Sequence, residues 1–250
     1  MTVINYYEYS AKVQDVYDLL DIIFCTFHPD NLRIYRGWEF WQKHQHLFPS
    51  QNYAFVKVKN FVDNDYAAIL FVNKKAFLKI VSKYITDFKN ILGADVTPQL
   101  LLEKVLHGDD VFGDVLKHHQ GLIGTLLGFG RDNAWLFHER EEISYYKGNP
   151  SPLLGESSYV FKKLPSQTSQ EVLSAFNRRL QSFDDRSSLH FHPLLMRLPS
   201  FAADPATIET KQLKINYQQQ YHQIVQRYKE GDFLEITLKQ ITSKPGLWES

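Results

Sequence analysis

One segment of this chain, residues 110–141, constrains the fold more than any other because it combines a helical pattern of apolar residues with five glycines. A helix turns by about 100° per residue, so side chains three and four positions apart share a face. The apolar side chains of the segment gather in one broad arc, at Phe112, Val115, Leu116, Leu122, Ile123, Leu126 and Leu127. We therefore predict a long glycine-containing central helix whose apolar arc faces the core.

The glycines of this segment need an explanation, because each glycine in a helix costs about 1 kcal/mol relative to alanine. Gly113, Gly124 and Gly128 lie away from the apolar arc of the predicted helix, together with Lys117 and Arg131. Close packing against a second helix is the simpler explanation, since small residues let two backbones approach. The alternative is a ligand or partner that binds at the glycine face, where Lys117 and Arg131 would meet an anion.

A third interpretation breaks the helix at Gly128-Phe129-Gly130. Asp132 would then cap a second helix, and the N-terminus of that helix could hold an anion, because its first amide groups lack partners within the helix. The glycines do not form the phosphate loop of a nucleotide-binding protein. The segment lacks both the Gly-Lys-Ser/Thr ending and the preceding strand that such loops require.

The balance of charges removes the main argument for a nucleic-acid or anionic-membrane partner. The chain has 28 basic and 28 acidic residues, so its formal net charge is zero, whereas such partners favour basic proteins. Its single cysteine, Cys25, forms no intramolecular disulfide. The first twenty residues do not resemble a secretory signal, and no apolar run approaches a membrane span. We predict no nucleic-acid partner and no cofactor, and we expect the cytoplasm unless a signal sequence has been removed.

Helical periods and short strand patterns alternate irregularly along the rest of the chain. Helical spacing covers residues 11–24, 32–49, 74–92, 97–108, 169–183 and 204–231, the last beginning at Asp204-Pro205. Strand patterns cover residues 53–62, 66–72, 159–164, 188–192 and 233–241, of which the first two form a hairpin. No regular strand–helix–strand rhythm is present, so we predict an α+β fold, predominantly helical, with a small, mostly antiparallel sheet. We expect a single globular domain over residues 1–250, and the loop at residues 148–152 is the best candidate boundary.

Three histidines are the candidates for chemistry. His119 falls inside the apolar arc, where a buried histidine usually makes a hydrogen bond and performs no reaction; the alternative is an acid, a base or a ligand. His190 and His192 would share a face of a strand and could bind one zinc ion. A metal site needs a third ligand, and no residue has a spacing that points at this pair. We therefore predict no metal and keep His119, His190 and His192 as catalytic candidates.

Aromatic side chains are concentrated in residues 35–48, around Trp38 and Trp41. They form either a core layer or a surface on which a partner docks, because tryptophan, tyrosine and arginine commonly anchor interfaces. The predicted binding residues for a ligand or partner are Trp38, Trp41, Lys117, Gly124, Gly128 and Arg131.

The sequence contains no motif of a known reaction. It has no His-Glu-x-x-His, no Gly-x-Ser-x-Gly and no dinucleotide-binding Gly-x-Gly-x-x-Gly after a strand. We therefore predict a non-enzymatic binding or protein-interaction protein with an unknown protein or small-molecule partner. The alternative is a hydrolase-type enzyme that uses histidines, with or without a metal ion. Removing His119 would lower stability alone in the first case, and would abolish turnover with little loss of stability in the second.

Overall fold

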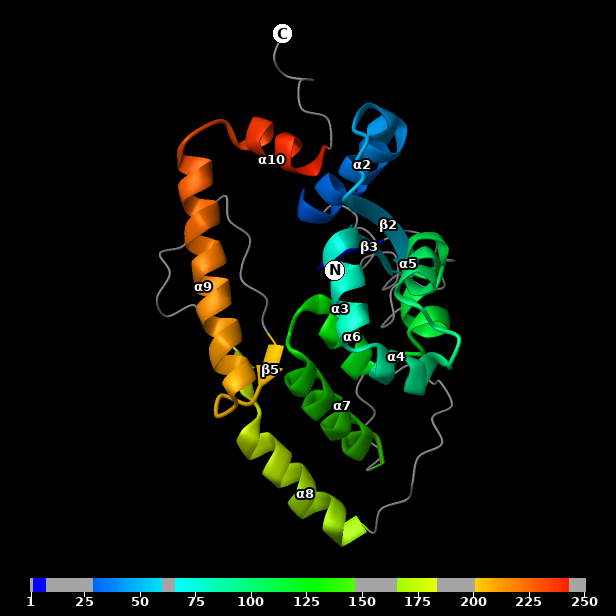
Figure 1. Cartoon of the computed structure of the whole chain (residues 1–250), viewed down its shortest axis with the longest axis vertical. Coiled ribbons are helices and arrows are strands. Elements are labelled where there is room, and N and C mark those ends of the chain that lie inside the picture. The colour runs from blue at the N-terminus through cyan, green and yellow to red at the C-terminus, as the bar shows by residue number, and fades with distance from the viewer. Residues whose placement is uncertain (1, 8–28, 60–65, 147–165, 184–200, 243–250) are drawn as a thin grey trace, which may run out of the picture. The chain divides into compact units, whose positions relative to one another are not determined.

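The computed structural model of the chain describes residues 2–7, 29–59, 66–146, 166–183 and 201–242 (Figure 1). The chain forms two compact units. One comprises the residues up to Lys117 together with those from Thr237 onward, and the other comprises residues 118–236. Helices predominate among the described residues, and the strands in this part of the chain pair antiparallel. The predicted α+β class is therefore confirmed. The single domain stays a prediction, and its candidate boundary at residues 148–152 lies outside the described residues.

The first unit contains a three-stranded antiparallel sheet. Its strands are β1 (Thr2–Tyr7), β2 (Tyr53–Lys59) and β3 (Tyr66–Asn73), in the order β1–β3–β2. The β2–β3 pair is the predicted hairpin, with Phe55 opposite Phe71. β1 was not predicted.

The central strand β3 is covered on both faces because its side chains alternate. Ala68, Leu70 and Val72 are buried on one face. On the other face Ile69 packs against Trp38. The aromatic segment therefore contributes a core layer at Trp38.

The helices of the first unit begin and end largely where the sequence indicates. They are α2 (Pro29–His44), the short 3-10 helix η1 (Gln45–Leu47), α3 (Lys74–Lys83), α4 (Ile85–Leu92) and α5 (Pro98–His107). Thr97 Oγ1 accepts a hydrogen bond from Leu100 N at 3.1 Å, which caps α5 as predicted. Gly93, with φ 121°, ends α4. The helix predicted over residues 74–92 is interrupted at Tyr84, whose backbone is not helical.

The segment predicted as one long central helix consists of three separate elements. They are a π-helical turn η2 (Val111–Val115), α6 (Gln120–Leu127) and α7 (Arg131–Tyr146). One break lies at Lys117 and His118, with φ 52° and 51°, and the other at Gly128 and Gly130, with φ 88° and 90°. A left-handed residue cannot continue a right-handed helix. The prediction of a continuous helix is therefore corrected, and the break at residues 128–130 agrees with the third interpretation of the sequence.

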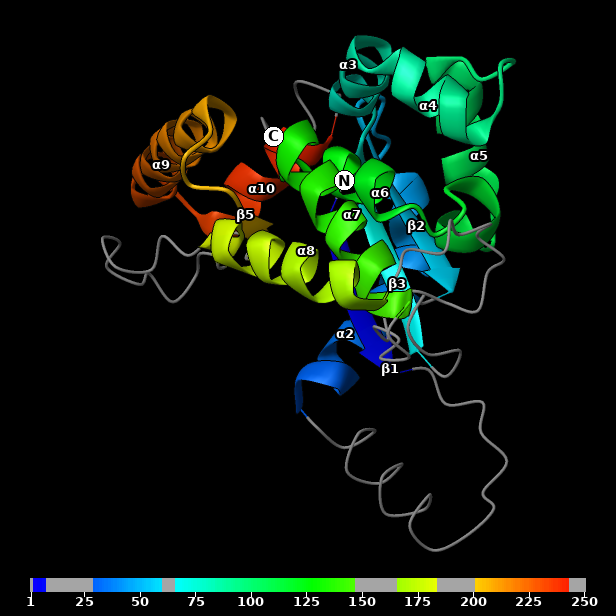
Figure 2. The ribbon, with the colours of Figure 1, turned by 90° about the horizontal axis from the view of Figure 1, so that it is seen from below.

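Helices α6 and α7 lie side by side (Figure 1 and Figure 2), and a glycine allows their close approach. A Cβ built on Gly124 would lie 2.8 Å from the Cβ of Ala134 in α7. Real Cβ atoms do not approach so closely, so only glycine fits this position without a shift of the helix. Close helix packing, the simpler explanation of the glycines, thus accounts for Gly124.

The second unit also contains two helices and a small sheet. Its elements are α8 (Ser166–Arg179), β4 (Gln181–Phe183), β5 (Phe201–Ala203) and α9 (Ile208–Lys229). The antiparallel pair β4–β5 was not predicted from the sequence. The helix predicted from Asp204-Pro205 begins later, because Thr207 caps α9 by accepting a hydrogen bond from Thr210 N at 3.2 Å.

The strand predicted over residues 233–241 is wrong, because this segment forms helix α10 (Phe233–Ile241). Its apolar residues satisfy both periods: Leu234, Leu238 and Ile241 are also spaced by four and three positions. Asp232 Oδ1 accepts a hydrogen bond from Glu235 N at 3.0 Å, which favours the helix at its start.

Several predicted features lie outside the described residues. They are the helix over residues 11–24 and the strands over residues 159–164 and 188–192, the second of which carries His190 and His192. Within the part of the chain that the structure describes, no helix is both long and apolar enough to cross a membrane.

Adding a methyl group at Gly124 tests the packing of α6 on α7. We expect Gly124→Ala to lower the free energy of unfolding by about 1–3 kcal/mol, because the methyl group must displace α7. Gly37, in α2, is the matched control, since nothing lies within 4 Å of a Cβ built there. Gly37→Ala should raise stability by about 0.5–1 kcal/mol. Urea-induced unfolding followed by circular dichroism measures both, and a stabilising Gly124→Ala would contradict the packing.

Candidate functional site

The N-terminus of α7 is held by a carboxylate from α9. Glu209 Oε1 accepts a hydrogen bond from Arg131 N at 2.8 Å, and Glu209 Oε2 accepts from Asp132 N at 2.9 Å and Asn133 N at 3.2 Å. The first amides of a helix have no partners within it and carry partial positive charge, so an anion stabilises them. We call this contact the Glu209 clamp. The anion that the sequence placed at this helix end is thus a side chain of the protein itself.

The glycine before α7 makes room for the Glu209 clamp. Gly130 has φ 90°, and a Cβ built on it would lie 2.6 Å from Glu209 Oε2. Any larger residue would therefore be strained in its backbone and would also collide with the carboxylate.

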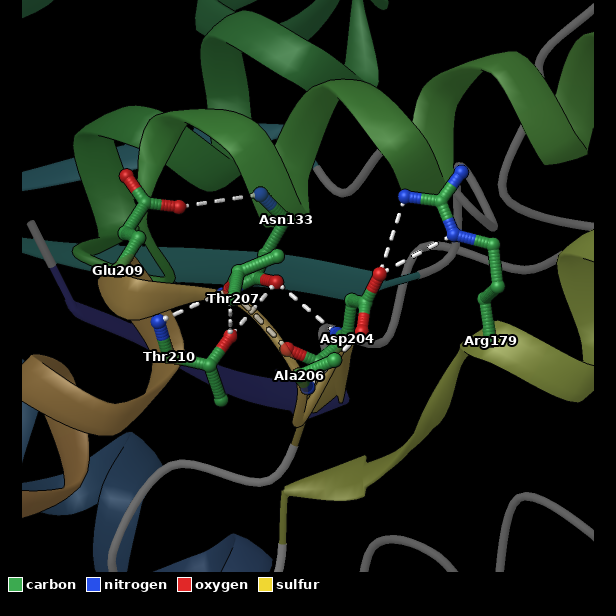
Figure 3. A network of polar contacts seen from close by, with 7 residues as sticks. All are labelled: Asn133, Arg179, Asp204, Ala206, Thr207, Glu209 and Thr210. Atoms are coloured by element: carbon green, nitrogen blue, oxygen red, sulfur yellow. Dashed lines mark hydrogen bonds and ion pairs between the residues drawn. The ribbon is translucent and has the colours of Figure 1, made fainter.

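A buried amide joins the clamp to the connection between β5 and α9 (Figure 3). Asn133 is 1% exposed. Its Oδ1 accepts hydrogen bonds from Asp204 N and Thr210 Oγ1, both at 3.0 Å, and its Nδ2 donates to Phe129 O at 3.2 Å. Every hydrogen-bonding atom of this side chain is engaged, as a buried amide requires. The start of α9 is therefore fixed to α7 at two neighbouring residues.

A charge pair fixes the same connection to the end of α8. The Arg179 Nε and Nη2 atoms donate to Asp204 Oδ2 at 3.1 Å and 3.0 Å, while Asp204 Oδ1 accepts from Ala206 N at 3.0 Å (Figure 3). Asp204 is buried, so its charge needs these partners.

A pocket of about 330 Å³ lies beside this fixed connection. We call it the α9 pocket; its walls are Gln181, Ser182, Phe183, Ala203, Pro205, Thr210, Lys211 and Lys214. Its volume is at the lower end of the range of about 300–1,000 Å³ found for small-molecule sites. The wall at Phe183 is firm, since this ring stacks on Phe201 with centroids 4.5 Å apart and Phe201 stacks on Phe129 at 4.6 Å.

The charged residues that line the α9 pocket, in the part of the chain that the structure describes, are both lysines. Lys211 and Lys214 are three positions apart, so they share a face of α9. Among the described residues no acidic side chain lines the pocket, and the carboxylates of Asp204 and Glu209 bind partners elsewhere. The described walls thus combine two lysines with an apolar surface.

His119, the histidine that the sequence placed in the apolar arc, is buried beside a second histidine. It is 3% exposed, and its Nδ1 accepts a hydrogen bond from Leu122 N at 3.3 Å at the start of α6. Its ring lies against that of His138, with centroids 3.8 Å apart and planes inclined by 33°, and it also contacts Trp135. The His119 Nδ1 atom is engaged with Leu122 N and the His138 Nδ1 atom has no partner among the described residues, so this pair lacks the hydrogen-bonded geometry of a general base and its orienting partner.

Burial keeps both histidines neutral. It lowers the pKa of His119 from 6.5 to about 4, partly offset by an interaction of the ring with the residue's own backbone. The pKa of His138 falls to about 3, because burial and then the charge of His119 disfavour its protonated form. His138 Nε2 lies 3.4 Å from Glu142 Oε1, and its Nδ1 has no hydrogen-bond partner among the described residues. Within the described ranges, no three histidine, cysteine or acidic side chains are close enough to hold a metal ion.

The predicted binding residues lie in different surroundings within their units. In the first unit, Trp38 is buried, Trp41 packs against Phe55, and Lys117 Nζ donates to Ile91 O at 2.9 Å. The exposed apolar side chains of the aromatic segment are instead Phe40 and Leu47, 62% and 53% exposed.

In the second unit the predicted binding residues contact other parts of the same unit. Gly128 O accepts a hydrogen bond from the Tyr217 hydroxyl at 2.9 Å, and burial raises the pKa of Tyr217. The Arg131 guanidinium lies 5.0 Å from the centre of the Trp135 ring. Together with Gly124 these residues are brought to the junctions of α6, α7 and α9, and none of them lines the α9 pocket.

The residues of the α9 pocket were missed by the sequence analysis. The spacing of Lys211 and Lys214 was a usable signal, because it places two positive charges on one helix face. Nothing in the sequence indicated that Gln181 and Ser182 would lie opposite them. No known protein family, no curated protein and no solved structure matches this chain.

Removing the carboxylate of Glu209 tests the clamp. We expect Glu209→Ala to lower the free energy of unfolding by about 2 kcal/mol, because three amides at the start of α7 lose a charged acceptor. Glu230→Ala, at the exposed C-terminal end of α9, is the control and should change stability by less than about 0.5 kcal/mol. Chemical unfolding measures both variants. Equal stabilities of the two variants would show that the clamp contributes nothing.

The histidine pair should make stability depend on pH. Unfolded histidines bind protons below about pH 6.5, whereas the folded pair binds them only near pH 4 and below. The free energy of unfolding therefore has its full value above pH 6.5. It falls between pH 6.5 and 4, by up to about 1.4 kcal/mol per pH unit for each histidine. The raised pKa of Glu142 acts in the opposite sense.

A variant without one of the two rings checks the origin of this dependence. His138→Phe keeps an aromatic ring against His119 and should roughly halve the slope of stability against pH. His222→Gln, at an exposed position of α9, is the control and should leave the slope unchanged. Urea unfolding at several values between pH 7 and 5 gives the slopes. A His138→Phe slope equal to that of the unaltered protein would assign the dependence to other groups.

Proposed function

We propose that this chain is a non-enzymatic binding protein whose ligand is a small molecule that occupies the α9 pocket. The observation that carries the proposal is a pocket of about 330 Å³ next to a rigidly held helix start. Its volume suits a small molecule.

The fixed walls support the proposal because ordering a site during binding costs free energy. Thr210 is held by Asn133, and the connection at Asp204 is held by Arg179. Lys211 follows directly after Thr210, and Lys214 lies one turn further along the same helix. The backbone that carries the lysines is thus in place before a ligand arrives.

The alternative, a hydrolase-type enzyme that uses histidines, has less support. A general base must reach the proton that it removes and must have a pKa near the working pH. His119 is buried, its Nδ1 is engaged with Leu122 N, and its pKa is about 4. His190 and His192 lie outside the described residues. Docking of a protein partner on the aromatic segment stays a prediction, with Phe40 and Leu47 as the exposed side chains there.

A fragment screen with a blocked pocket tests the proposal. We expect some members of a mixed library of neutral, cationic and anionic fragments to shift amide signals of residues 181–183 and 210–214 in nuclear magnetic resonance spectra. Ser182→Trp would fill the pocket and abolish these shifts. Gln219→Trp adds the same ring at an exposed position of α9 outside the pocket and should leave them intact. A library that shifts no pocket signal in the unaltered protein would overturn the proposed function.

A further inference from the structure

We infer that α6 is an acid-sensitive helix, which separates from α7 when His119 and His138 bind protons. The inference is independent of the proposed function, because it concerns the packing of α6 on α7 and not the α9 pocket. It follows from the hydrogen bond at the start of α6, from the contact between the two imidazole rings and from their burial. Acid therefore releases one helix before the rest of the chain unfolds.

The imidazole of His119 is the N-cap of α6. Its Nδ1 atom accepts a hydrogen bond from Leu122 N at 3.3 Å, so Nδ1 carries no proton in this state. A protonated imidazole has an N–H donor at both nitrogens and accepts no hydrogen bond. A proton bound at Nδ1 therefore breaks the cap and sets two N–H groups against each other.

The proton also brings a positive charge to the unfavourable end of the helix. The first amides of a helix carry partial positive charge, so a cation beside them is destabilising. The usual N-cap residues are serine, threonine, asparagine and aspartate, whose oxygen atoms remain acceptors in mild acid. A histidine cap differs because its acceptor nitrogen takes up a proton in acid. The start of α6 is therefore capped in neutral solution and loses its cap in acid.

The second histidine lies against the first from the facing helix. The ring centroid of His138, in α7, is 3.8 Å from that of His119, and the two residues are 5% and 3% exposed. Two protonated rings at this distance repel each other, and a buried charge is costly without a partner. Separation of α6 from α7 relieves the repulsion and gives both rings access to water.

Other ionisable groups also lie beside the two histidines. Glu142 Oε1 is 3.4 Å from His138 Nε2, and burial raises the pKa of Glu142, so this carboxylate loses part of its charge in acid. The Arg131 guanidinium lies over Trp135, whose ring contacts His119, and it adds positive charge on that side. Helix α6 and strand β5, which pack on α7, contain no ionisable residue. The neighbouring segments also carry Lys117, His118, Glu139 and, on α8, Glu171, Arg178 and Arg179.

The difference in proton affinity between the packed and the released helix sets the size of the effect. A histidine that is exposed by the release has a pKa near 6.5, whereas burial holds the pKa of His119 at about 4 and that of His138 at about 3. At pH 5 each histidine therefore favours release by up to about 30-fold, and the pair by up to about 1,000-fold. The raised pKa of Glu142 acts in the opposite sense and reduces this factor.

Hydrogen exchange of the 250-residue chain, followed by nuclear magnetic resonance, measures the release of α6. Between pH 7 and pH 5 the protection factors of the α6 amides should fall at least about 30-fold. At pH 5 they should also lie below those of the β3 amides, because α6 separates while the sheet stays folded. A fall of less than about threefold would overturn the inference. Equal protection of α6 and β3 at pH 5 would show that the chain unfolds as a whole, which also contradicts it.

Variants at the two histidines identify the groups that are responsible. His119→Asn keeps an acceptor that does not titrate, and in combination with His138→Phe it should leave the protection of α6 nearly equal at pH 7 and pH 5. His119→Ala has no acceptor, so its α6 amides should be about fivefold less protected at pH 7 than those of His119→Asn. His222→Gln, at an exposed position of α9, is the control and should show the full fall of the unaltered protein.

Two results with these variants would count against the inference. A fall that persists in the double variant would assign the release to other groups. Equal protection in His119→Ala and His119→Asn at pH 7 would show that the ring does not cap α6. Unfolding curves at pH 7 establish that each variant is folded. If the double variant does not fold, His138→Phe alone decides, because one remaining histidine should reduce the fall to roughly its square root.

Discussion

The second unit depends on one electrostatic contact, the carboxylate of Glu209 against the first three amides of α7. Helix N-termini attract anions in general, and many proteins leave them open to phosphate or carboxylate ligands. Here the acceptor comes from a residue 78 positions further along the chain. The same contact sets the start of α9, since Asn133 N donates a hydrogen bond to Glu209 Oε2 and Asn133 Oδ1 accepts one from Thr210 Oγ1. The need of α7 for an acceptor at its N-terminus thus positions the start of α9.

The first amides of α7 receive their acceptor from the chain itself, so this helix end is closed to an external anion. The helix end that the sequence suggested for a ligand is occupied by the Glu209 carboxylate. Further along α9, Lys211 and Lys214 line the α9 pocket. Two acidic residues of this region, Asp204 and Glu209, stabilise the fold through Arg179 and through the first amides of α7.

Local signals in the sequence predicted local structure well. The β2–β3 hairpin, the Thr97-Pro98 start of α5 and the end of α4 at Gly93 each depend on residues within a few positions of one another. The prediction of one long central helix was wrong because periodicity does not reveal single left-handed residues, and a positive φ is uncommon at residues other than glycine, such as Lys117 and His118. The prediction of a strand over residues 233–241 was wrong because the spacing of the apolar residues fits both the strand period and the helix period. The site could not be predicted, since its decisive contacts join Asn133 to Asp204 and Thr210 across more than 70 positions.

The geometry at Gly130 also defines how relatives of this chain can be recognised. A side chain at position 130 would collide with the carboxylate at position 209, and without that carboxylate the amides at positions 131–133 lose their acceptor. The two positions are therefore constrained together, and the φ of 90° at Gly130 favours glycine whatever residue occupies position 209. A distant homologue that keeps this unit should carry the glycine, the asparagine three residues later and the acidic residue in the first turn of α9 as a joint signature, even where overall similarity has been lost.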